Sequence, residues 1–397
     1  MRGLYVARWN TSSYYVDTAH YIQIFHSSDG GYTWEFRANV GHNGQGYITS
    51  DFGLGLTLDP NTGHLYLIAL CHYYEHTPFV GLEVFKSEDG GRTWRSAHVF
   101  DEYYTYATYD YATADIAFDP LRNRLIAYYF KQSTDNIGIA ISVDGGNSWQ
   151  EISYLPVYPK GEDVEGEMEV GPDGIIWIAD WFSTYPECWV SVDGGYTWTS
   201  YVIDYLDGSS KSARSVGLAY IPPYLYALLW TTSTPAYLYR SGDGGKTWTK
   251  ISTVVYDAAS DDGSCALAAQ YSWLYAVFWD RSHESTVYRS TDGGYTWEYV
   301  SDIPRYEPWY YPASAIAMTV DVLPFGVEEE ASEKDSLKAL GLRGSLLVIY
   351  SGEVEIYDAA GRSIVKTKIP GRASFSLPGG VYFVRAGKRV ARAAVSP

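Results

Sequence analysis

Five acidic residues stand at or near the starts of short runs of small residues, or on the last loop before such a run. A pair of carboxylates at a suitable separation can act as acid and base, or as acid and nucleophile, on a glycosidic bond. The same groups could instead hold a cation or accept hydrogen bonds from backbone amides. The candidate catalytic residues are Asp51, Asp115, Glu165, Asp262 and Glu307.

Aromatic side chains crowd the segments between the expected strands. Tyrosine occurs 39 times and tryptophan 14 times, so much of the apolar mass carries a polar group that suits a wet, ligand-facing surface. Aromatic rings can stack on the C–H faces of sugars, while neighbouring carboxylates accept hydrogen bonds from hydroxyl groups. The alternative is that these tyrosines only pack the loops. The candidate ligand-binding residues are Trp9, Trp181, Trp230, Trp279, Tyr310, Arg214 and Arg305.

An eight-residue motif, S-x-D-G-G-x-T-W, recurs along the chain, and the candidate residues lie in the segments outside its copies. We call each copy a box. An Asp followed by two glycines favours a tight turn between two strands, because Asp bonds its own backbone and Gly accepts positive φ. Successive boxes begin 49 to 60 residues apart, a period that fits one four-stranded propeller blade. The six copies begin at Ser27, Ser87, Ser142, Ser191, Ser241 and Ser290.

This consensus resembles the Asp-box, or BNR repeat, of sialidases, sortilin-like receptors, xyloglucanases and photosystem-assembly propellers. The resemblance implies an all-β, six-bladed β-propeller, with the boxes on the face opposite the ligand site. A sialidase would also clamp its substrate carboxylate with three arginines that begin at a Phe/Tyr-Arg-Ile-Pro motif, and this motif is absent. The arginines expected near the rim are Arg8, Arg214, Arg281 and Arg305.

The pattern between the boxes predicts the strand order within each blade. A short run rich in small residues, such as Gly53 to Leu58, is expected to form the innermost strand, and a longer apolar run such as Leu65 to Leu70 the next one. The first blade has no such innermost run before it. We expect Ala313 to Val322 to supply it from the other end of the chain, which closes the ring and removes an exposed edge.

The propeller is expected to span residues 1–325, followed by an acidic linker at 326–337 and a small β-sandwich at 338–397. Segments such as VEIYDAAGRSI and FSLPGGVYFVRAG in the last 50 or so residues resemble the C-terminal sorting domain of type IX secretion substrates. That resemblance implies export and attachment to, or release from, the cell surface. The alternative is a generic small sandwich that serves oligomer contacts.

The net charge of −18 is divided unevenly along the chain. From Lys338 to the end, ten Lys and Arg outnumber three Asp and Glu. The acidic remainder argues against nucleic acid and anionic membranes as partners. Three cysteines without CxxC spacing predict neither a zinc site nor a disulfide framework. No transmembrane span is expected, and no signal peptide, since Met1 stands three residues before a strand.

These patterns leave three functional hypotheses open. The first is an exported cell-surface or secreted propeller that binds a glycan or another surface polymer, without a cofactor or metal. The second is a glycoside hydrolase of sialidase-like type. The third is a structural subunit of an extracellular assembly that associates with itself through the basic C-terminal domain. A deep pocket with two carboxylates would favour hydrolysis, and a shallow aromatic groove would favour binding.

Overall fold

The computed structural model contains β-strands and no helix among the residues that it describes. These are residues 3–395 except 11–20, 42–52, 74–78, 105–112, 132, 135, 158–165, 182–184, 206–212, 232–233, 255–262, 271, 281–284, 305–315, 321–337, 343–344, 359–361, 379 and 387–388. The chain divides into two compact units, Met1–Asp321 and Val322–Pro397. Within the described ranges no helix is long and apolar enough to cross a membrane.

The strands of the first unit form six four-stranded antiparallel sheets in the part of the chain that the structure describes, numbered 1 to 6 below. Sheet 1 contains β24 (Ile316–Val320), β1 (Leu4–Asn10), β2 (Tyr21–Ser27) and β3 (Glu35–Val40). Sheet 2 contains β4 (Leu54–Leu58), β5 (Leu65–Tyr73), β6 (Phe79–Ser87) and β7 (Arg95–Tyr104). Sheet 3 contains β8 (Ala114–Asp119), β9 (Arg124–Lys131), β10 (Asn136–Ser142) and β11 (Gln150–Leu155).

The remaining three sheets repeat this pattern. Sheet 4 contains β12 (Glu167–Val170), β13 (Ile176–Asp180), β14 (Glu187–Ser191) and β15 (Thr199–Val202). Sheet 5 contains β16 (Ala213–Ile221), β17 (Tyr224–Thr231), β18 (Thr234–Ser241) and β19 (Thr249–Val254). Sheet 6 contains β20 (Gly263–Gln270), β21 (Trp273–Asp280), β22 (Ser285–Ser290) and β23 (Glu298–Ile303).

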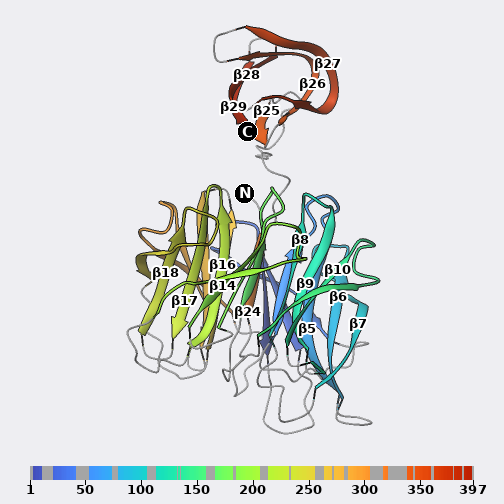
Figure 1. The fold of residues 1–397 in the computed structure, drawn as a ribbon, viewed down its shortest axis with the longest axis vertical. Helices are drawn as coiled ribbons and strands as arrows, with labels where there is room; N and C mark the ends of the chain where they lie inside the picture. The colour runs from blue at the N-terminus through green and yellow to red at the C-terminus, as the bar shows by residue number, and fades with distance from the viewer. Residues whose placement is uncertain are drawn as a thin grey trace. The chain divides into compact units, whose positions relative to one another are not determined.

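The first strand of each sheet lies against the first strands of the two neighbouring sheets. The contacts run from β24 to β4, β8, β12, β16 and β20, and from β20 back to β24. Figure 1 shows the sheets standing side by side around these strands. This arrangement is that of a β-propeller, so the all-β, propeller-like prediction is confirmed.

Two glycines of the first strands mark where neighbouring strands approach most closely. A Cβ atom on Gly55 of β4 would lie 2.7 Å from the Cα atom of Asp115 on β8. A Cβ atom on Gly217 of β16 would lie 2.9 Å from the backbone nitrogen of Leu267 on β20. Any side chain at either position would therefore push neighbouring sheets apart, which explains the small residues in these runs.

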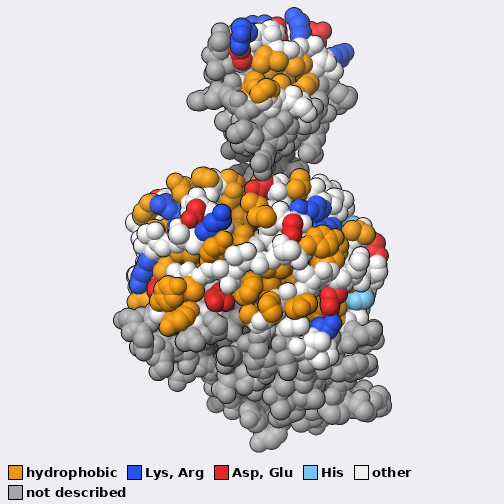
Figure 2. Space-filling view, in the orientation of Figure 1, with side chains coloured by type: hydrophobic (Ala, Val, Ile, Leu, Met, Phe, Trp, Pro, Cys, Tyr) orange, Lys and Arg blue, Asp and Glu red, His pale blue; other side chains and the backbone are white. Residues whose placement is uncertain are grey.

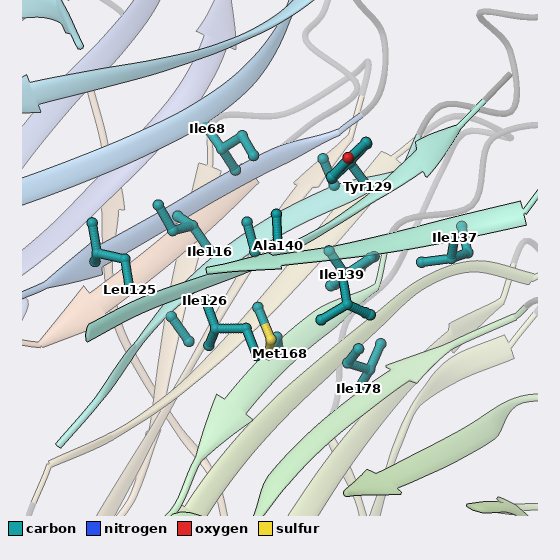
Figure 3. Close-up of a cluster of buried hydrophobic side chains, with 14 of the residues drawn as sticks. Ile68, Ile116, Leu125, Ile126, Tyr129, Ile137, Ile139, Ala140, Met168 and Ile178 are labelled. Atoms are coloured by element: carbon teal, nitrogen blue, oxygen red, sulfur yellow. The ribbon is translucent and has the colours of Figure 1, made fainter. Parts of the chain in front are cut away.

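The apolar core lies between the sheets rather than inside any one of them. One cluster joins Ile68 of sheet 2, Ile126 and Ile139 of sheet 3, and Met168 and Ile178 of sheet 4. Figure 3 shows these side chains pointing toward one another from neighbouring ribbons. Burial between sheets is the main force that holds such a ring together, because each sheet alone leaves both of its apolar faces in water.

Each box forms a closed turn whose polar groups satisfy one another. In the fourth box the Ser191 hydroxyl donates to Asp193 Oδ1 at 2.8 Å and accepts from the Gly195 amide at 2.7 Å. Asp193 also accepts from the Thr197 amide at 3.0 Å and from its hydroxyl at 2.6 Å. Gly194 and Gly195 have φ values of 88° and 95°, which favour glycine. The box residues are thus used by the turn itself.

The box tryptophans also join neighbouring sheets. The Trp198 indole N–H lies 3.2 Å from the Ser153 hydroxyl of sheet 3, and that of Trp297 lies 3.2 Å from Ser252 of sheet 5. The Trp34 indole donates at 3.0 Å to Ser301 of sheet 6. The first box is therefore tied to the last sheet by the same contact that joins successive sheets.

Ring closure follows the predicted scheme. β24 pairs antiparallel with β1, with Leu4 opposite Val320 and Arg8 opposite Ile316. Sheet 1 thus combines one strand from the C-terminal side of the unit with three strands from its start. The predicted strand, Ala313 to Val322, also includes residues that lie outside the described ranges.

The second unit contains one five-stranded sheet with its own core. Its strands are β25 (Lys338–Leu342), β26 (Ser345–Asp358), β27 (Ser363–Ser376), β28 (Gly380–Ala386) and β29 (Arg389–Val395). β26 pairs with β27 along its length, and with β25 and then β28 on its other side. Val348, Val354, Ile356 and Val384 are buried in the core of this unit.

Candidate functional site

Antiparallel pairing gives each propeller sheet two chemically different ends. In sheet 4, Ile176 pairs with Ser191, which opens a box, and Asp180 at the other end of the same strand pairs with Glu187. We call the first the box end and the second the loop end. The predicted ligand site belongs to the loop end, because the chain leaves the second and fourth strands of every sheet there.

Half of the predicted site residues lie outside the described residues. Of the five candidate acids, Asp51, Glu165, Asp262 and Glu307 fall there, as do Arg281, Arg305 and Tyr310. Trp9 and Arg214 lie on β1 and β16, but their side chains are not among those described. The structure therefore places Asp115, Arg8 and three of the tryptophans.

The three tryptophans are buried, which corrects the expectation that they project from the rim. Trp181, Trp230 and Trp279 are 6%, 1% and 5% exposed. Trp230 packs in a core cluster with Phe278 of the next sheet, with ring centroids 6.1 Å apart. Each tryptophan lies at or next to the end of a second strand. Stacking on a ligand would require these rings to leave the interior.

Arg8 is also buried, and its guanidinium group bridges two sheets. It donates to Gln23 Oε1 of its own sheet at 3.2 Å. Across the closure between sheets 1 and 6 it donates to the Ser285 hydroxyl and to the carbonyl oxygens of Ile303 and Pro304, at 3.2, 3.3 and 2.9 Å. A guanidinium engaged in this way supports ring closure and does not extend to a substrate carboxylate.

Asp115 is the one predicted acid that the structure describes, and backbone amides engage both of its oxygens. Oδ1 accepts from the Ile116 amide at 2.7 Å, and Oδ2 accepts from the Met168 amide of β12 at 2.6 Å. Burial raises the pKa of this carboxyl group to about 8, although both hydrogen bonds act against the rise. Asp115 therefore links β8 to β12, the first strand of the next sheet. Hydrogen bonding to backbone amides is one of the alternatives to catalysis that the sequence left open.

Two acids that the sequence reasoning did not select lie beside Asp115. Glu167 and Glu169 alternate with Met168 on β12, so both extend from the same face of the strand. Glu167 accepts from the Leu218 amide of β16 at 2.5 Å and from the Leu267 amide of β20 at 3.3 Å. One carboxyl group thus links the first strands of sheets 4, 5 and 6. The sequence signal that could have identified these two acids is the alternation of Glu and Met in a short inner strand.

A fourth acid, Asp180, closes the group at the loop end of β13. Its Oδ2 accepts from the Thr113 hydroxyl at 2.9 Å, and its Oδ1 from the Trp181 amide at 2.6 Å. The Tyr128 hydroxyl lies 3.2 Å from that of Thr113. Burial raises the pKa of Asp180 to about 7, against these hydrogen bonds.

The inner carboxyl cluster, as we name Asp115, Glu167, Glu169 and Asp180, holds protons more tightly than isolated acids do. Burial and the charge of Asp115 raise the pKa of Glu167 well above its usual value and that of Glu169 to about 8. Glu167 and Glu169 keep part of their surface exposed, whereas Asp115 and Asp180 are buried. The described residues contain no group of three or more His, Cys, Asp or Glu that could hold a metal ion.

We expect this cluster to make the propeller less stable as pH rises from 6.5 to 8.5. In that range the carboxyl groups of an unfolded chain are already deprotonated. In the folded chain Asp180 and Glu169, with pKa values of about 7 and 8, are still partly protonated and lose their protons as pH rises. The folded state therefore binds more protons, and the free energy of unfolding falls as pH rises. Urea unfolding at both pH values measures the fall.

Two other residues, His26 and Asp243, have lowered pKa values and contribute little to the change between pH 6.5 and 8.5. Burial, with a contribution from Arg37, lowers the pKa of His26 to about 4, so its effect on stability is confined to pH below about 6.5. Hydrogen bonds from Thr247 help to lower the pKa of the box residue Asp243 to about 2, below the range entirely.

The Asp180→Asn variant should show a smaller fall in the free energy of unfolding between pH 6.5 and 8.5. If the variant and the parent show an equal fall, the pH dependence is caused by groups other than Asp180.

The described part of the loop end also carries an aromatic pair, Tyr185 and Tyr205, of which Tyr185 is half-buried and Tyr205 is exposed. Tyr185 precedes β14 and Tyr205 follows β15, and their ring centroids lie 5.2 Å apart at an angle of 67°. Tyr205 is 69% exposed. The Ile203 amide donates to the Pro186 carbonyl at 2.8 Å, and the Tyr239 hydroxyl of sheet 5 donates to Asp204. These bonds hold the two segments that carry the pair.

Comparison with protein families confirms the box. A family model described as BNR/Asp-box repeat matches residues 288–299, which include the sixth box. Curated proteins give no sequence match. Among solved structures, a chain of a nidogen–laminin complex matches with a TM-score of 0.50 at 12% identity, covering 81% of this chain and 99% of that one. At that identity the likeness concerns the fold alone.

Two glycoside-acting proteins are also similar in structure. A Hadza microbial sialidase matches with a TM-score of 0.48 at 16% identity over 69% of this chain. A GH74 xyloglucanase from Xanthomonas campestris matches with a TM-score of 0.46 at 18% identity over 75% of this chain. The present chain spans 63% of the sialidase and 43% of the xyloglucanase.

Proposed function

We propose that this chain is an exported six-bladed propeller that binds a glycan, or a similar cell-surface polymer, at the loop end of its sheets. The observation that carries the proposal is the exposed ring of Tyr205, which packs against the half-buried Tyr185 at that end. Tyrosine offers a large rigid surface at little cost in side-chain entropy, which is why it is enriched at binding surfaces. A ring that is 69% exposed, on segments held by hydrogen bonds, is available for stacking on a sugar.

The topology supports this location. The segments that leave the sheets at the loop end include YYTYATYDYATAD at 103–115 and RYEPWYYP at 305–312. Both segments continue from fourth strands, β7 and β23, which end at the loop end. The boxes use the other end, and their polar groups are bonded within the turn.

Binding is favoured over hydrolysis by the state of the described acids. Asp115 and Asp180 are buried, and each accepts hydrogen bonds on both oxygens. Glu167 is bonded to two neighbouring strands. An acid and base working on a glycosidic bond must reach the substrate oxygen. Among the described residues the cluster therefore fits a structural role better than the glycoside hydrolase alternative.

For the second unit we propose a role in sorting or surface attachment, with a sandwich-like fold and an acidic linker at 326–337. Its own apolar core, which includes Val354 and Ile356, supports a separately folded module. Its excess of Lys and Arg, beside an acidic remainder, supports self-association as a further role.

A glycan array followed by a matched pair of variants tests the binding proposal. The parent protein should retain at least one class of glycan, and Tyr205→Ala should lose that retention while its melting temperature stays close to the parent's. Tyr154→Ala is the control, because Tyr154 is 59% exposed but lies on β11 at the outer edge of sheet 3. It should bind like the parent.

Three results would contradict the proposal. The parent retaining no glycan on the array is the first, and equal losses in the two tyrosine variants is the second. Release of free sugar from a bound glycan is the third, and it would establish the hydrolase alternative in place of simple binding.

A further inference from the structure

Two arginines at the box end are each held between two aromatic rings. The Cζ atom of Arg240 lies 4.5 Å from the ring centroid of Tyr224 and 5.4 Å from that of Tyr295. The Cζ atom of Arg289 lies 4.9 Å from the ring of Trp273 and 5.1 Å from that of Tyr32. We call these the two stacks.

The stacks have the same construction and cross neighbouring sheet boundaries. In each, the arginine immediately precedes a box serine, and one ring begins the second strand of the same sheet. The other ring is the variable residue of the next box around the ring, Tyr295 in sheet 6 or Tyr32 in sheet 1. The two stacks therefore lie on consecutive sheets, 5, 6 and 1, at one end of the propeller.

The box tyrosines keep a ring face open. Tyr295 and Tyr32 are 53% and 55% exposed, although an arginine covers one side of each ring. Their backbones belong to box turns, in which both glycines have positive φ and the Asp accepts bonds from the turn. Such rings are positioned before any ligand arrives, so binding costs little ordering entropy.

The charges around the stacks are largely balanced. Glu298 Oε1 accepts from Arg289 Nη2 at 2.6 Å and from its Nε at 2.9 Å, and the Tyr32 hydroxyl accepts from Nη2 at 2.7 Å. Box acids such as Asp292, whose pKa is lowered to about 2, add negative charge nearby. On the face that Figure 2 draws, hydrophobic, acidic and basic side chains are interleaved over the described residues. Such a surface attracts neither polyanions nor polycations strongly.

We propose that the two stacks form a second carbohydrate-binding surface, at the box end, for a neutral β-linked polysaccharide. Flat sugar rings with equatorial hydroxyl groups present C–H faces to the open faces of Tyr32 and Tyr295. The guanidinium of Arg240, which lies beside the Tyr295 ring, donates hydrogen bonds to their hydroxyl groups. Exposed aromatic rings in a fixed arrangement are typical of interaction sites. This surface is distinct from the loop-end site proposed above.

Native affinity electrophoresis in gels that contain soluble mixed-linkage β-glucan tests the proposal. The polysaccharide should retard the parent protein, and the double variant Tyr32→Ala, Tyr295→Ala should bind at least about tenfold more weakly. Tyr196→Ala is the matched control. Tyr196 has the same place in its box and is 55% exposed, but the preceding sheet carries Ile141 where Arg240 and Arg289 stand in the stacks. This control should migrate like the parent.

Two more variants separate ring stacking from folding and from the loop end. Tyr32→Phe with Tyr295→Phe keeps both rings, and it should retain binding even if the alanine variant is destabilised. Tyr205→Ala should also retain binding to the β-glucan, whatever it does to a loop-end glycan. The proposal is overturned if β-glucan does not retard the parent, if Tyr196→Ala binds as weakly as the double alanine variant, or if the Phe variant loses binding.

Discussion

A chain that ends at Pro312 is expected to lose the cooperative thermal transition of the propeller. Without β24, β1 has no partner on its inner side, and β4 and β20 lose the strand that lies between them. Ile316, Met318 and Val320 are all buried. Burial of three such side chains is worth roughly 5–9 kcal/mol, which approaches the whole stability of a typical domain.

Scanning calorimetry on two truncated chains checks this result. A chain that ends at Phe325 lacks the C-terminal unit but keeps β24, so it serves as the control and should melt cooperatively. If the chain that ends at Pro312 melts at the same temperature as the one that ends at Phe325, then β24 does not close the ring in the way its pairing with β1 indicates.

The second large effect is expected at Trp230. This side chain is almost completely buried in a cluster that joins sheets 5 and 6, where it contacts Phe278. Replacement by alanine removes the indole and leaves a cavity, which typically costs about 3–5 kcal/mol. Urea unfolding of Trp230→Ala should therefore show a large loss of stability and a lower midpoint.

Trp273→Ala is the control for this loss, since the same residue type stands 38% exposed at the start of β21. Its removal should cost clearly less. A Trp230→Ala variant that keeps its stability but loses glycan retention would instead restore the sequence-based prediction that this residue belongs to the ligand site.

Much of the propeller could be predicted because its signals are local and repeated. The hydrogen bonds among the Ser, Asp, Gly and Thr residues of a box join residues at most four apart, such as Asp193 and Thr197, so the turn can be predicted from the eight-residue motif alone. The missing inner strand could also be predicted, because five complete repeats show what the first one lacks. Its pairing with Leu4 to Arg8 follows that expectation.

The candidate site was predicted less well because its geometry depends on distant parts of the chain. Residue type suggested that Trp230 and Trp279 face a ligand, but both are buried, and Trp230 packs against Phe278 of the next sheet. The selection of acids by their position before small-residue runs found Asp115 but not Glu167 or Asp180. Glu167 bonds to Leu267, 100 residues away, and Asp180 bonds to Thr113, 67 residues away.

The sequence by itself determined the repeating turn, the strand order within a sheet and the strand that closes the ring. The first two depend on backbone preferences and hydrogen bonds within a short stretch. The closing strand could be identified because five complete repeats show which strand the first one lacks. Only the tertiary structure decided which side chains are buried, which acids have a raised pKa and which arginines are held between aromatic rings. Those properties arise where two sheets meet, since Arg289 and Tyr32, 257 residues apart, become neighbours only when the ring closes.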